Sequence, residues 1–311
     1  MSVLVVGSFM TDLVARTKKK PVPGQTVVGT SFDIFLGGKG ANQAIAAKRS
    51  NSKTYMVGAV GSDSFGSNFL NFFADSGFDK SHIVIKENIS SGVGHIVIDE
   101  DSGQNQIIII PGSNLLFNVD DLIKFSDLFN QCNIVVNQLE MSDEIIRACK
   151  HLAKANNKLY LLNPAPYKHL SDSLLDGIDF FTPNETELAA SIGKTSLNTL
   201  SEIESAAKTL VDKGVKNVIV TLGERGAYHV SKDVCKLYPA YKVTQVIDTV
   251  AAGDAFNGTF AAMIDQGKSI EQAIKYANAS GALTVSKKGA IPSIPTFSEI
   301  EKFINLTNTR V

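Results

Sequence analysis

The sequence has no tryptophan, and its 311 residues include only three cysteines, Cys132, Cys149 and Cys235. These cysteines are odd in number, far apart and without a C-x-x-C pair, which argues against a disulfide framework or a structural zinc site. The five histidines show no paired ligand spacing, so we expect no transition-metal site either. A reducing compartment fits this cysteine usage, and we predict a cytoplasmic location, with a nuclear pool compatible with a eukaryotic source.

Neither sign of charge is in excess, because 30 Lys and Arg residues face 31 Asp and Glu residues. A net charge of −1 provides no basic field to attract nucleic acid or an anionic membrane surface. Gly, Pro or charged residues interrupt each apolar run before it could span a bilayer, and the first residues lack the features of a signal peptide. We therefore expect neither nucleic acid nor membrane as a partner, and local geometry must hold any anionic ligand.

Short runs rich in Val, Ile and Leu alternate with segments of helical periodicity. The predicted strands are Val3–Gly7, Tyr55–Val60, Ile134–Leu139, Leu159–Asn163, Phe180–Pro183 and Val218–Leu222. The predicted helices are Ala41–Arg49, Ser142–Ala155, Ser201–Lys213, Asp254–Gln266 and Ile270–Val285, with Ser142, Ser201 and Ser269 at N-cap positions. Near-continuous apolar strands between helices predict a doubly wound, mostly parallel α/β sheet with helices on both faces and ligands at the carboxyl ends of its strands.

Two stretches interrupt this alternation, at about residues 12–36 and 92–111. In the second, His95–Asp99 and Gln106–Pro111 predict a β-hairpin with a turn between them. Such a hairpin could extend an edge of the large sheet or belong to a separate small sheet. We expect the separate sheet, acting as a β lid over the strand ends, and we assign residues 1–311 to a single α/β domain that carries it.

The first of two glycine-rich segments, Gly37–Gln43, reads G-G-K-G-A-N-Q and precedes an alanine-rich helix. Its glycines would let backbone N–H groups approach a ligand closely. It does not fit the P-loop, because Gly40 stands after Lys39 where Ser or Thr is required, and it lacks the third glycine of the dinucleotide fingerprint. Taken alone, the segment could equally be a tight turn without a ligand.

The second segment, Asp248–Phe256, reads D-T-V-A-A-G-D-A-F and leads small residues into a helix whose first turn carries Asp254. Free N–H groups and a carboxylate would then face one point. This arrangement suits phosphoryl transfer, since the amides stabilise the charge of the moving phosphoryl group and the carboxylate accepts a proton from an attacking hydroxyl. The alternative is that Asp254 only caps its helix.

Together, the two segments resemble the paired signatures of the ribokinase branch of the PfkB carbohydrate kinase family. Three further motifs agree in order and spacing: Asn163–Pro166 as N-P-A-P, Thr182–Glu187 as T-P-N-E-T-E and Thr221–Gly226 as T-L-G-E-R-G. The resemblance runs from Gly7 to Ser293. It implies a ribokinase-like fold, transfer of phosphate from ATP to the 5-hydroxyl of a pentose, and a homodimer formed through the β lid.

The resemblance also implies roles for single residues near the reacting groups. Asp254 is implied to take the proton from the sugar hydroxyl, the amides of Ala252, Gly253 and Asp254 to form an anion hole, and Lys39 to lie near the phosphoryl group. The residues implied to contact the sugar are Met10, Thr11, Asp12, Gly38, Lys39, Gly40, Ala41, Asn42, Glu140 and Asp254.

Nucleotide and metal sites follow from the same resemblance. Asn184 and Glu187 are implied to organise Mg²⁺ through water, although they could simply cap and charge the start of a helix. The residues implied along ATP are Asn184, Thr221, Leu222, Gly223, Glu224, Arg225, Gly226, Gly253, Asp254 and Asn278. The oxygen ligands implied for an activating K⁺ come from Asp248, Val250, Thr284, Lys287, Gly289 and Ser293.

One position departs from many bacterial members of the family, because Met10 stands where they have Asn. A thioether cannot replace the hydrogen bonds that an amide donates to a sugar hydroxyl. Losing one such bond penalises a hydroxyl-bearing sugar relative to a deoxy sugar by on the order of 1 kcal/mol. We expect D-ribose as substrate, with 2-deoxyribose as the alternative; a nucleoside kinase and a catalytically inactive sugar-binding protein are further alternatives.

Overall fold

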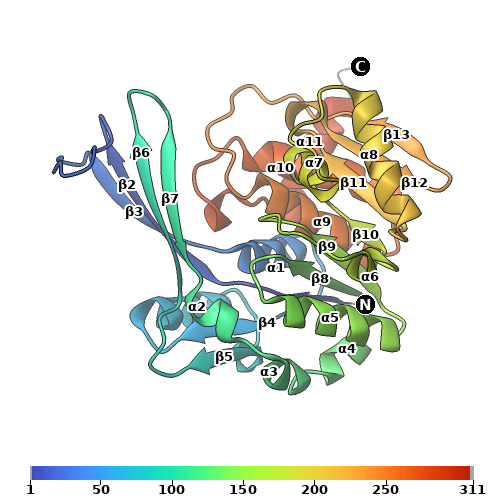
Figure 1. Cartoon of the computed structure of the whole chain (residues 1–311), viewed down its shortest axis with the longest axis horizontal. Coiled ribbons are helices and arrows are strands. Elements are labelled where there is room, and N and C mark those ends of the chain that lie inside the picture. Colours follow the sequence, from blue (N-terminus) through green and yellow to red (C-terminus); the bar gives the residue numbers. More distant parts are fainter. Residues whose placement is uncertain (1, 309–311) are drawn as a thin grey trace.

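A nine-stranded β-sheet forms the centre of the computed structural model, which describes residues 2–308 (Figure 1). Its strands are β1 (Val3–Val6), β4 (Thr54–Gly61), β5 (Ile83–Lys86), β8 (Ile134–Gln138), β9 (Leu159–Asn163), β10 (Phe180–Phe181), β11 (Asn217–Thr221), β12 (Ala227–Ser231) and β13 (Cys235–Tyr238). Their spatial order is β13-β12-β11-β10-β9-β8-β1-β4-β5. Strands from β11 to β5 pair in parallel, and β12 and β13 add an antiparallel edge. The predicted doubly wound, mostly parallel sheet is therefore confirmed.

All six predicted strands are confirmed to within two residues at each end. Strands β5, β12 and β13 were not predicted, because each has only four or five residues and because polar residues interrupt the apolar pattern of β12 and β13. Strand β1 shows why the central runs are so apolar. Val3 and Val5 pack into the core on one face of the sheet, whereas Leu4 and Val6 pack into the core on the other.

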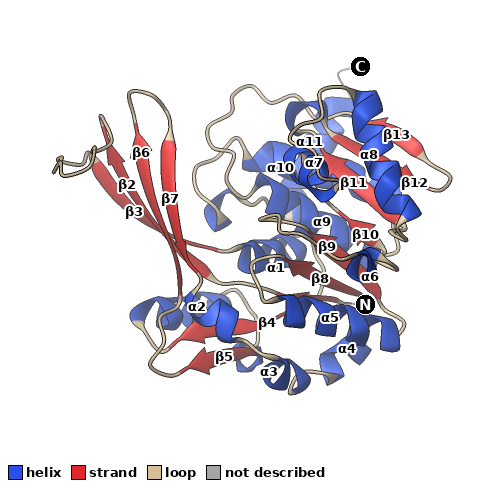
Figure 2. Cartoon of the chain, viewed as in Figure 1, coloured by secondary structure: helices blue, strands red, loops and turns tan. Residues whose placement is uncertain are grey.

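Helices cover both faces of this sheet, as Figure 2 shows. The α-helices are α1 (Lys39–Arg49), α2 (Ser64–Asp75), α3 (Val119–Ile123), α4 (Asp127–Gln131), α5 (Asp143–Ala155), α6 (Asp172–Leu175), α7 (Glu185–Ser191), α8 (Leu200–Asp212), α9 (Ala252–Asp265), α10 (Ile270–Thr284) and α11 (Phe297–Asn308). Short 3₁₀ turns are η1 (Lys80–His82), η2 (Gly112–Leu116), η3 (Gly223–Arg225) and η4 (Ile291–Ser293). Among residues 2–308, no helix has the length and apolar character needed to cross a membrane.

The predicted helix starts were partly correct. Ser142 and Ser269 are N-caps, and each side chain accepts a hydrogen bond from the first turn of its helix. The prediction for Ser201 was wrong, because α8 begins earlier, with Thr199 as its N-cap. The Thr199 hydroxyl accepts from the Glu202 amide at 3.2 Å, and the Glu202 carboxylate accepts from the Thr199 amide at 3.1 Å. This reciprocal pair satisfies two free amides at once, which a single serine further along could not do.

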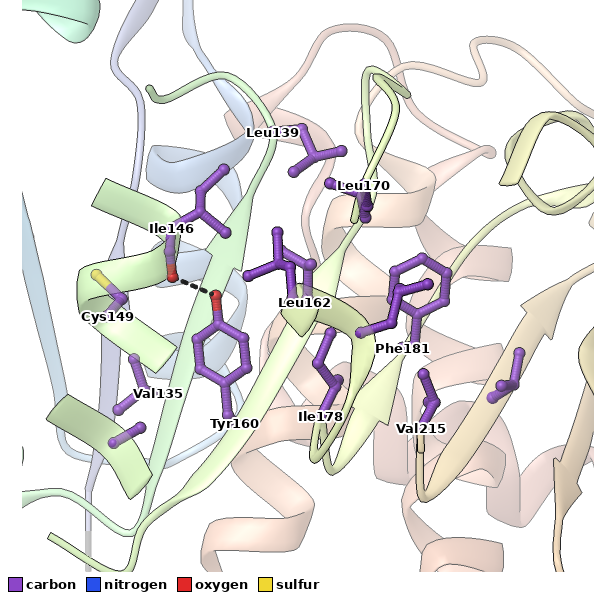
Figure 3. Close-up of a cluster of buried hydrophobic side chains, with 14 of the residues drawn as sticks. Val135, Leu139, Ile146, Cys149, Tyr160, Leu162, Leu170, Ile178, Phe181 and Val215 are labelled. Atoms are coloured by element: carbon purple, nitrogen blue, oxygen red, sulfur yellow. Dashed lines mark hydrogen bonds between the residues drawn. The ribbon is translucent and has the colours of Figure 1, made fainter. Parts of the chain in front are cut away.

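Two cores hold the helices on the sheet. Helices α5 and α8 pack on one face, where Tyr160 is buried and its hydroxyl donates to the Asn137 side chain at 3.0 Å and to the Ile146 carbonyl at 3.3 Å (Figure 3). Helices α1, α9 and α10 pack on the other face. Full burial of each large aliphatic or aromatic side chain contributes about 1.5–3 kcal/mol to this packing. The second core fixes the starts of α1 and α9 beside each other.

A second, four-stranded sheet stands apart from the central one in Figure 1. It comprises β2 (Met10–Thr17), β3 (Ser31–Gly37), β6 (Gly92–Asp99) and β7 (Asn105–Ile110), in the order β3-β2-β6-β7. β2 pairs in parallel with β6, and the outer pairs are antiparallel. The expected separate sheet is confirmed, and the alternative of an extended edge is wrong. We call this sheet the lid sheet; the assignment of the chain to a single domain stays a prediction.

Candidate active site

A cavity of about 420 Å³ lies between the lid sheet and the carboxyl ends of the central strands. This volume is in the range of small-molecule sites. The lid sheet contributes Met10, Asp12, Gly94, Ile96, Ile107 and Ile109 to the lining. The rest of the chain contributes Gly38, Lys39, Asn42, Glu140, Asn163, Ala165, Thr182, Asn184, Glu187, Thr221, Thr249, Val250, Ala251, Gly253, Asp254 and Asn257.

The cavity brings together about half of the predicted site residues. Those that line it are Met10, Asp12, Gly38, Lys39, Asn42, Glu140, Asn184, Glu187, Thr221, Val250, Gly253 and Asp254. Those outside the lining are Thr11, Gly40, Ala41, Leu222, Gly223, Glu224, Arg225, Gly226, Asp248, Ala252, Asn278, Thr284, Lys287, Gly289 and Ser293. The second group comprises mainly the residues expected along the nucleotide and around K⁺.

Asp254 occupies the first turn of α9 and is held by two amide side chains. Asn42 Nδ2 donates to Asp254 Oδ2 at 2.8 Å, and Gln43 Nε2 donates to Asp254 Oδ1 at 3.0 Å. Both donors come from α1, which packs directly against α9. Hydrogen bonds to a carboxylate favour its charged form and fix its orientation. The Asp254 carboxylate is thus held in one orientation at the cavity.

The backbone before Asp254 leaves amides free at the same point. Ala251 adopts a left-handed conformation, with φ of 61°, and α9 starts directly after it. The Ala252 amide has an acceptor in the Thr249 carbonyl at 3.4 Å, and the first bond within the helical turn runs from the Ala255 amide to the Ala251 carbonyl. Within residues 2–308, the amides of Gly253 and Asp254 have no acceptor. Of the three amides expected in an anion hole, these two are available to bind a ligand.

A chain of buried amide side chains extends behind Asp254. Gln138 Nε2 donates to Gln43 Oε1 at 2.8 Å, Gln43 Nε2 also contacts Asn163 Oδ1 at 3.1 Å, and Asn163 Nδ2 donates to the Thr182 carbonyl at 2.9 Å. We did not predict a role for any of these residues. Asn163 ends one predicted strand and Gln138 is the last but one residue of another, so their position was a usable signal. What the sequence could not show is that both strand ends meet Gln43.

Lys39 lies near four carboxylates around the cavity. Burial alone would lower the pKa of Lys39, but the negative charges of Asp254, Glu140, Glu187 and Asp12 outweigh it and raise this pKa. The ammonium group therefore stays charged at neutral pH. A cation held at this place can attract the negative charge of a phosphoryl group.

Asp12 lines the cavity from the lid sheet and has an unusual acidity. Its burial, together with the negative charges of Glu140 and Asp254, raises its pKa from 3.8 to about 7, against the opposing effect of Lys39. The carboxyl group therefore changes charge near neutral pH. No donor among residues 2–308 forms a hydrogen bond with the Asp12 carboxylate, in contrast to the carboxylate of Asp254.

The amides of the first glycine-rich segment are already used within the protein. The Lys39 amide donates to Glu140 Oε2 at 3.0 Å, the Gly40 amide to Ser8 Oγ at 3.3 Å and the Ala41 amide to the Ser8 carbonyl at 3.0 Å. Ser8 Oγ in turn donates to Glu140 Oε2. The expectation that these N–H groups face a ligand is therefore corrected: here the lining consists of the Gly38 backbone and the side chains of Lys39, Asn42 and Glu140.

Asn184 and Glu187 form a reciprocal capping pair at the start of α7. Asn184 Oδ1 accepts from the Glu187 amide and Glu187 Oε2 accepts from the Asn184 amide, both at 2.8 Å. Both residues nevertheless line the cavity, and burial raises the pKa of Glu187. Among residues 2–308, no group of three or more His, Cys, Asp and Glu side chains is arranged to hold a metal directly. An amide and a carboxylate beside the cavity fit Mg²⁺ bound through water, because this ion keeps several of its waters.

The segment that follows β11 only partly enters the cavity. Thr221 lines it, whereas Leu222 is buried in a core and Arg225 forms an ion pair with Glu185. Asn278 on α10 is buried, and its Nδ2 donates to the carbonyls of Tyr238 and Pro239 at 3.1 and 3.2 Å. Asn278 therefore connects α10 to the end of β13 and is buried instead of being an exposed helix residue.

Three of the six residues expected around K⁺ are joined by hydrogen bonds. The Gly289 amide donates to Asp248 Oδ2 at 3.0 Å, and the Val250 amide donates to Asp248 Oδ1 at 3.0 Å. The ligands expected from Thr284, Lys287 and Gly289 are backbone carbonyls, and the ligand expected from Ser293 is its hydroxyl. Ser293 Oγ donates to the Ala290 carbonyl, so this oxygen keeps lone pairs for a cation. The Thr284 carbonyl accepts from the Lys287 amide at 3.1 Å. The oxygen-only donor set fits a hard monovalent cation.

Comparisons with known proteins agree with this geometry. Residues 1–297 match the family described as pfkB family carbohydrate kinase. A deoxyribokinase from Salmonella typhi is 38% identical over 307 residues, covering 98% of this chain and 99% of that protein. A ribokinase from Haemophilus influenzae is 36% identical over 300 residues, covering 96% and 97%. The structure of Arabidopsis thaliana ribokinase complexed with ribose and ATP is 30% identical, with a TM-score of 0.90 and coverage of 97% and 98%. The resemblance inferred from five motifs is confirmed, and the chain belongs to the pfkB family of carbohydrate kinases.

Proposed function

We propose that this protein transfers the γ-phosphoryl group of ATP to the 5-hydroxyl of D-ribose, giving ribose 5-phosphate and ADP. The observation that carries the proposal is Asp254, fixed by Asn42 and Gln43 beside two free amides in the cavity. The relatives named ribokinase and the Arabidopsis structure with ribose and ATP support it.

In the proposed reaction, each of these groups has a separate role. The pentose hydroxyl lies against Asp254, its oxygen forms the new bond to the γ-phosphorus, and its proton passes to the Asp254 carboxylate as the bond to the β-phosphate breaks. The amides of Gly253 and Asp254 stabilise the charge on the moving phosphoryl group, and Lys39 neutralises it from the opposite segment. A loose transition state needs the base mainly for orientation and late proton capture.

Mg²⁺ would be held near Asn184 and Glu187 through its own waters and would neutralise charge on the phosphates of ATP. The chain's contribution is to keep both residues at the cavity. Their capping pair fixes the start of α7, and the second oxygen of Glu187 remains available toward the cavity.

The sugar itself has two candidates, ribose and 2-deoxyribose. Met10 favours the second, because its thioether lines the cavity without donating a hydrogen bond to a hydroxyl. The deoxyribokinase and ribokinase relatives have similar identity to this chain, at 38% and 36%. We keep ribose as the first candidate, because Asp12, Asn42 and Glu140 still present polar groups to the sugar.

An ATP-coupled assay with purified protein tests the proposal over ribose, 2-deoxyribose, ribulose, fructose and adenosine. Highest kcat/KM on ribose is the expected result. A preference for 2-deoxyribose would select the alternative, a preference for adenosine would indicate a nucleoside kinase, and sugar binding without turnover would indicate an inactive binding protein.

We also propose that K⁺ activates the enzyme by binding beside the anion hole at Asp248. Its support is the hydrogen bond from the Gly289 amide to Asp248, which joins two segments that the cation would bridge. Assays at equal ionic strength should show a several-fold higher kcat in K⁺ than in Na⁺. Equal rates in the two salts would remove this proposal without affecting the sugar assay.

A homodimer through the lid sheet is proposed from the face that points away from the cavity. On this face Ile34 pairs with Leu13, Leu13 with His95, and His95 with Ile108, so a row that is apolar except for His95 crosses all four strands. Ile34 and Ile108 are 54% and 62% exposed. Monomers rarely expose such a row, and a second copy would cover it. Light scattering should give a dimer that Ile108→Asp disrupts, with Val28→Asp on a lid loop as the control; a monomeric parent protein would contradict the proposal.

A cytoplasmic location completes the proposal. The three cysteine thiols are unpaired, as a reducing compartment allows. Fractionation of source cells followed by immunodetection tests it.

A further inference from the structure

Asn114 is a fully buried residue in η2, directly after the lid strand β7, and it belongs to none of the motifs that revealed the family. Its side chain contacts the residue just before β2 and the residue just after β7. Asn114 Oδ1 accepts from the Phe9 amide at 2.9 Å, while Nδ2 donates to the Phe9 carbonyl at 2.8 Å and to the Pro111 carbonyl at 2.9 Å. One amide group therefore joins the segment entering β2 to the segment leaving β7.

The same Nδ2 atom also lies 3.3 Å from the sulfur of Met10. Met10 is only 5% exposed, and it lines the cavity from β2. A methionine side chain has three rotatable bonds and usually fills space adaptively, so it needs a partner to hold one conformation. Sulfur is a weak acceptor, and the two Nδ2 hydrogens already serve the Phe9 and Pro111 carbonyls, so the sulfur shares one of them in a bifurcated contact.

Gly92, the first residue of β6, makes this meeting possible. Met10 and Gly92 are register partners. A methyl group on Gly92 would lie 2.3 Å from Asn114 Nδ2, 2.5 Å from Met10 Sδ and 2.6 Å from the Phe9 carbonyl oxygen. Only glycine leaves room for the amide and the thioether to touch across the strand. Three residues from three segments thus form one packed cluster at the stem of the lid sheet.

We propose that Asn114 is a positioning residue that holds the Met10 thioether against the sugar part of the cavity and thereby sets the affinity for the sugar. Asn114 does not line the cavity and touches no reacting group. It acts through Met10 and through the three backbone bonds that fix the stem of the lid sheet. The proposal depends on the proposed function in one respect only: it assumes that the molecule bound beside Met10 is a pentose.

Two substitutions separate the parts of this cluster. Asn114→Asp keeps an acceptor for the Phe9 amide but turns an oxygen without hydrogen toward Met10 and two carbonyls. Asn114→Ala removes all four contacts. Ser113→Ala is the matched control, because Ser113 is equally buried in the same turn, and its hydroxyl donates to the Ala59 carbonyl at 3.0 Å on the central sheet. It disturbs the turn without touching Met10.

Steady-state kinetics give the first readout. We expect both Asn114 variants to raise the KM for the preferred pentose about fivefold or more, with kcat and the KM for ATP changed less than twofold and Ser113→Ala unchanged. Met10→Leu removes the sulfur acceptor, so adding Asn114→Asp to it should raise the sugar KM by far less than in the parent protein. The proposal would be overturned if the KM for the sugar and the KM for ATP rose together. It would also be overturned if the effects of Asn114→Asp and Met10→Leu on the sugar KM were fully additive.

A second readout needs no substrate and remains valid if neither Asn114 variant is active. The chain has five methionines, so protein labelled with ¹³C at the methionine methyl groups gives few signals, and Met10→Leu identifies the one from Met10. This signal should shift and narrow in Asn114→Asp and stay in place in Ser113→Ala. A Met10 signal unchanged in folded Asn114 variants contradicts the proposal. If the parent protein phosphorylates no pentose, the proposed function fails, while this spectrum still decides the role of Asn114.

Discussion

The two glycine-rich segments look alike in sequence, yet their glycines serve different purposes. In the first, a methyl group on Gly38 would lie 2.6 Å from the Met10 amide nitrogen, and one on Gly40 would lie 2.4 Å from the Ser8 amide nitrogen. In the second, a methyl group on Gly253 would meet no atom within 4 Å. The first segment needs glycine so that the backbones of α1 and β1 can approach each other. The second needs it to leave the cavity open.

The two segments accordingly contribute different groups to the cavity. The first supplies side chains, since Lys39 and Asn42 reach the cavity while the amides of residues 39–41 are used for packing. The second supplies backbone, since the amides of Gly253 and Asp254 remain free. A motif rich in glycine therefore indicates a close approach, but only the structure shows whether the partner is a ligand or the protein itself.

The strongest test of this comparison is Asp254→Asn. The variant keeps the shape of the side chain and loses the proton acceptor, so we expect kcat to fall at least about a hundredfold with little change in the binding of sugar and ATP. Rapid-quench kinetics and calorimetry measure the two effects. Asp265→Asn is the control on the same helix, where the carboxylate accepts from Ser52 and Asn133 instead. Near-normal turnover in Asp254→Asn would remove Asp254 as the base.

Gly253→Ala should act on catalysis alone. The added methyl group meets only open space in the fold, so the melting temperature should stay within about one degree of the parent value. In the complex with substrates, the added methyl group would lie where the phosphoryl group approaches and would block access to the Gly253 amide. We expect kcat to fall about tenfold or more, as it does when an anion-hole donor is lost. A variant with unchanged kcat would show that the phosphoryl group lies elsewhere.

Gly40→Ala should show the opposite pattern. Its methyl group would collide with the backbone of Gly7 and Ser8, and overpacking of this kind costs about 1–3 kcal/mol of folding free energy. Thermal unfolding should therefore occur several degrees lower. Equal melting temperatures for Gly40→Ala and Gly253→Ala would contradict the distinction between the two segments.

The sequence was sufficient for the sheet and for the place of Asp254 in the first turn of a helix, because both depend on local signals. Apolar strand runs and helix periodicity gave β1, β8 and β9 to within one residue, and small residues before Asp254 indicated an open helix start. It was not sufficient for the partners of Asp254. Gln43 and Gln138 are 95 residues apart in the chain, and only the packing of the start of α1 against the carboxyl end of β8 brings their amides together.

The same limit applies to Asn114 and to the acidity of Asp12. Asn114 follows a lid strand and looks like an ordinary turn residue, because the Phe9 and Met10 atoms that it contacts lie more than a hundred residues earlier. The pKa of Asp12 depends on Glu140 and Asp254, which no local pattern connects to it. Contacts between residues far apart in the chain arise from the topology of the fold. A local sequence pattern therefore cannot indicate these residues unless they belong to a motif that is recognised as a whole.

Asp12 gives the test with the smallest expected effect. Each glycine-rich segment has one carboxylate beside it: the Asp12 carboxylate lies close to Gly37 of the first segment, and Asp254 follows Gly253 in the second. The Asp12 pKa of about 7 predicts that the KM for the sugar falls as pH rises from 6 to 8, when the ionised group becomes able to accept from a hydroxyl.

The same pKa predicts that folding stability falls as pH rises. The folded state keeps a proton on Asp12 that the unfolded chain releases near pH 4, so the free energy of unfolding decreases between about pH 4 and pH 7. Asp12→Asn should remove both dependences, and its melting temperature relative to the parent should be higher at pH 8 than at pH 4. A sugar KM that is flat across neutral pH in the parent protein would show that Asp12 does not contact the sugar.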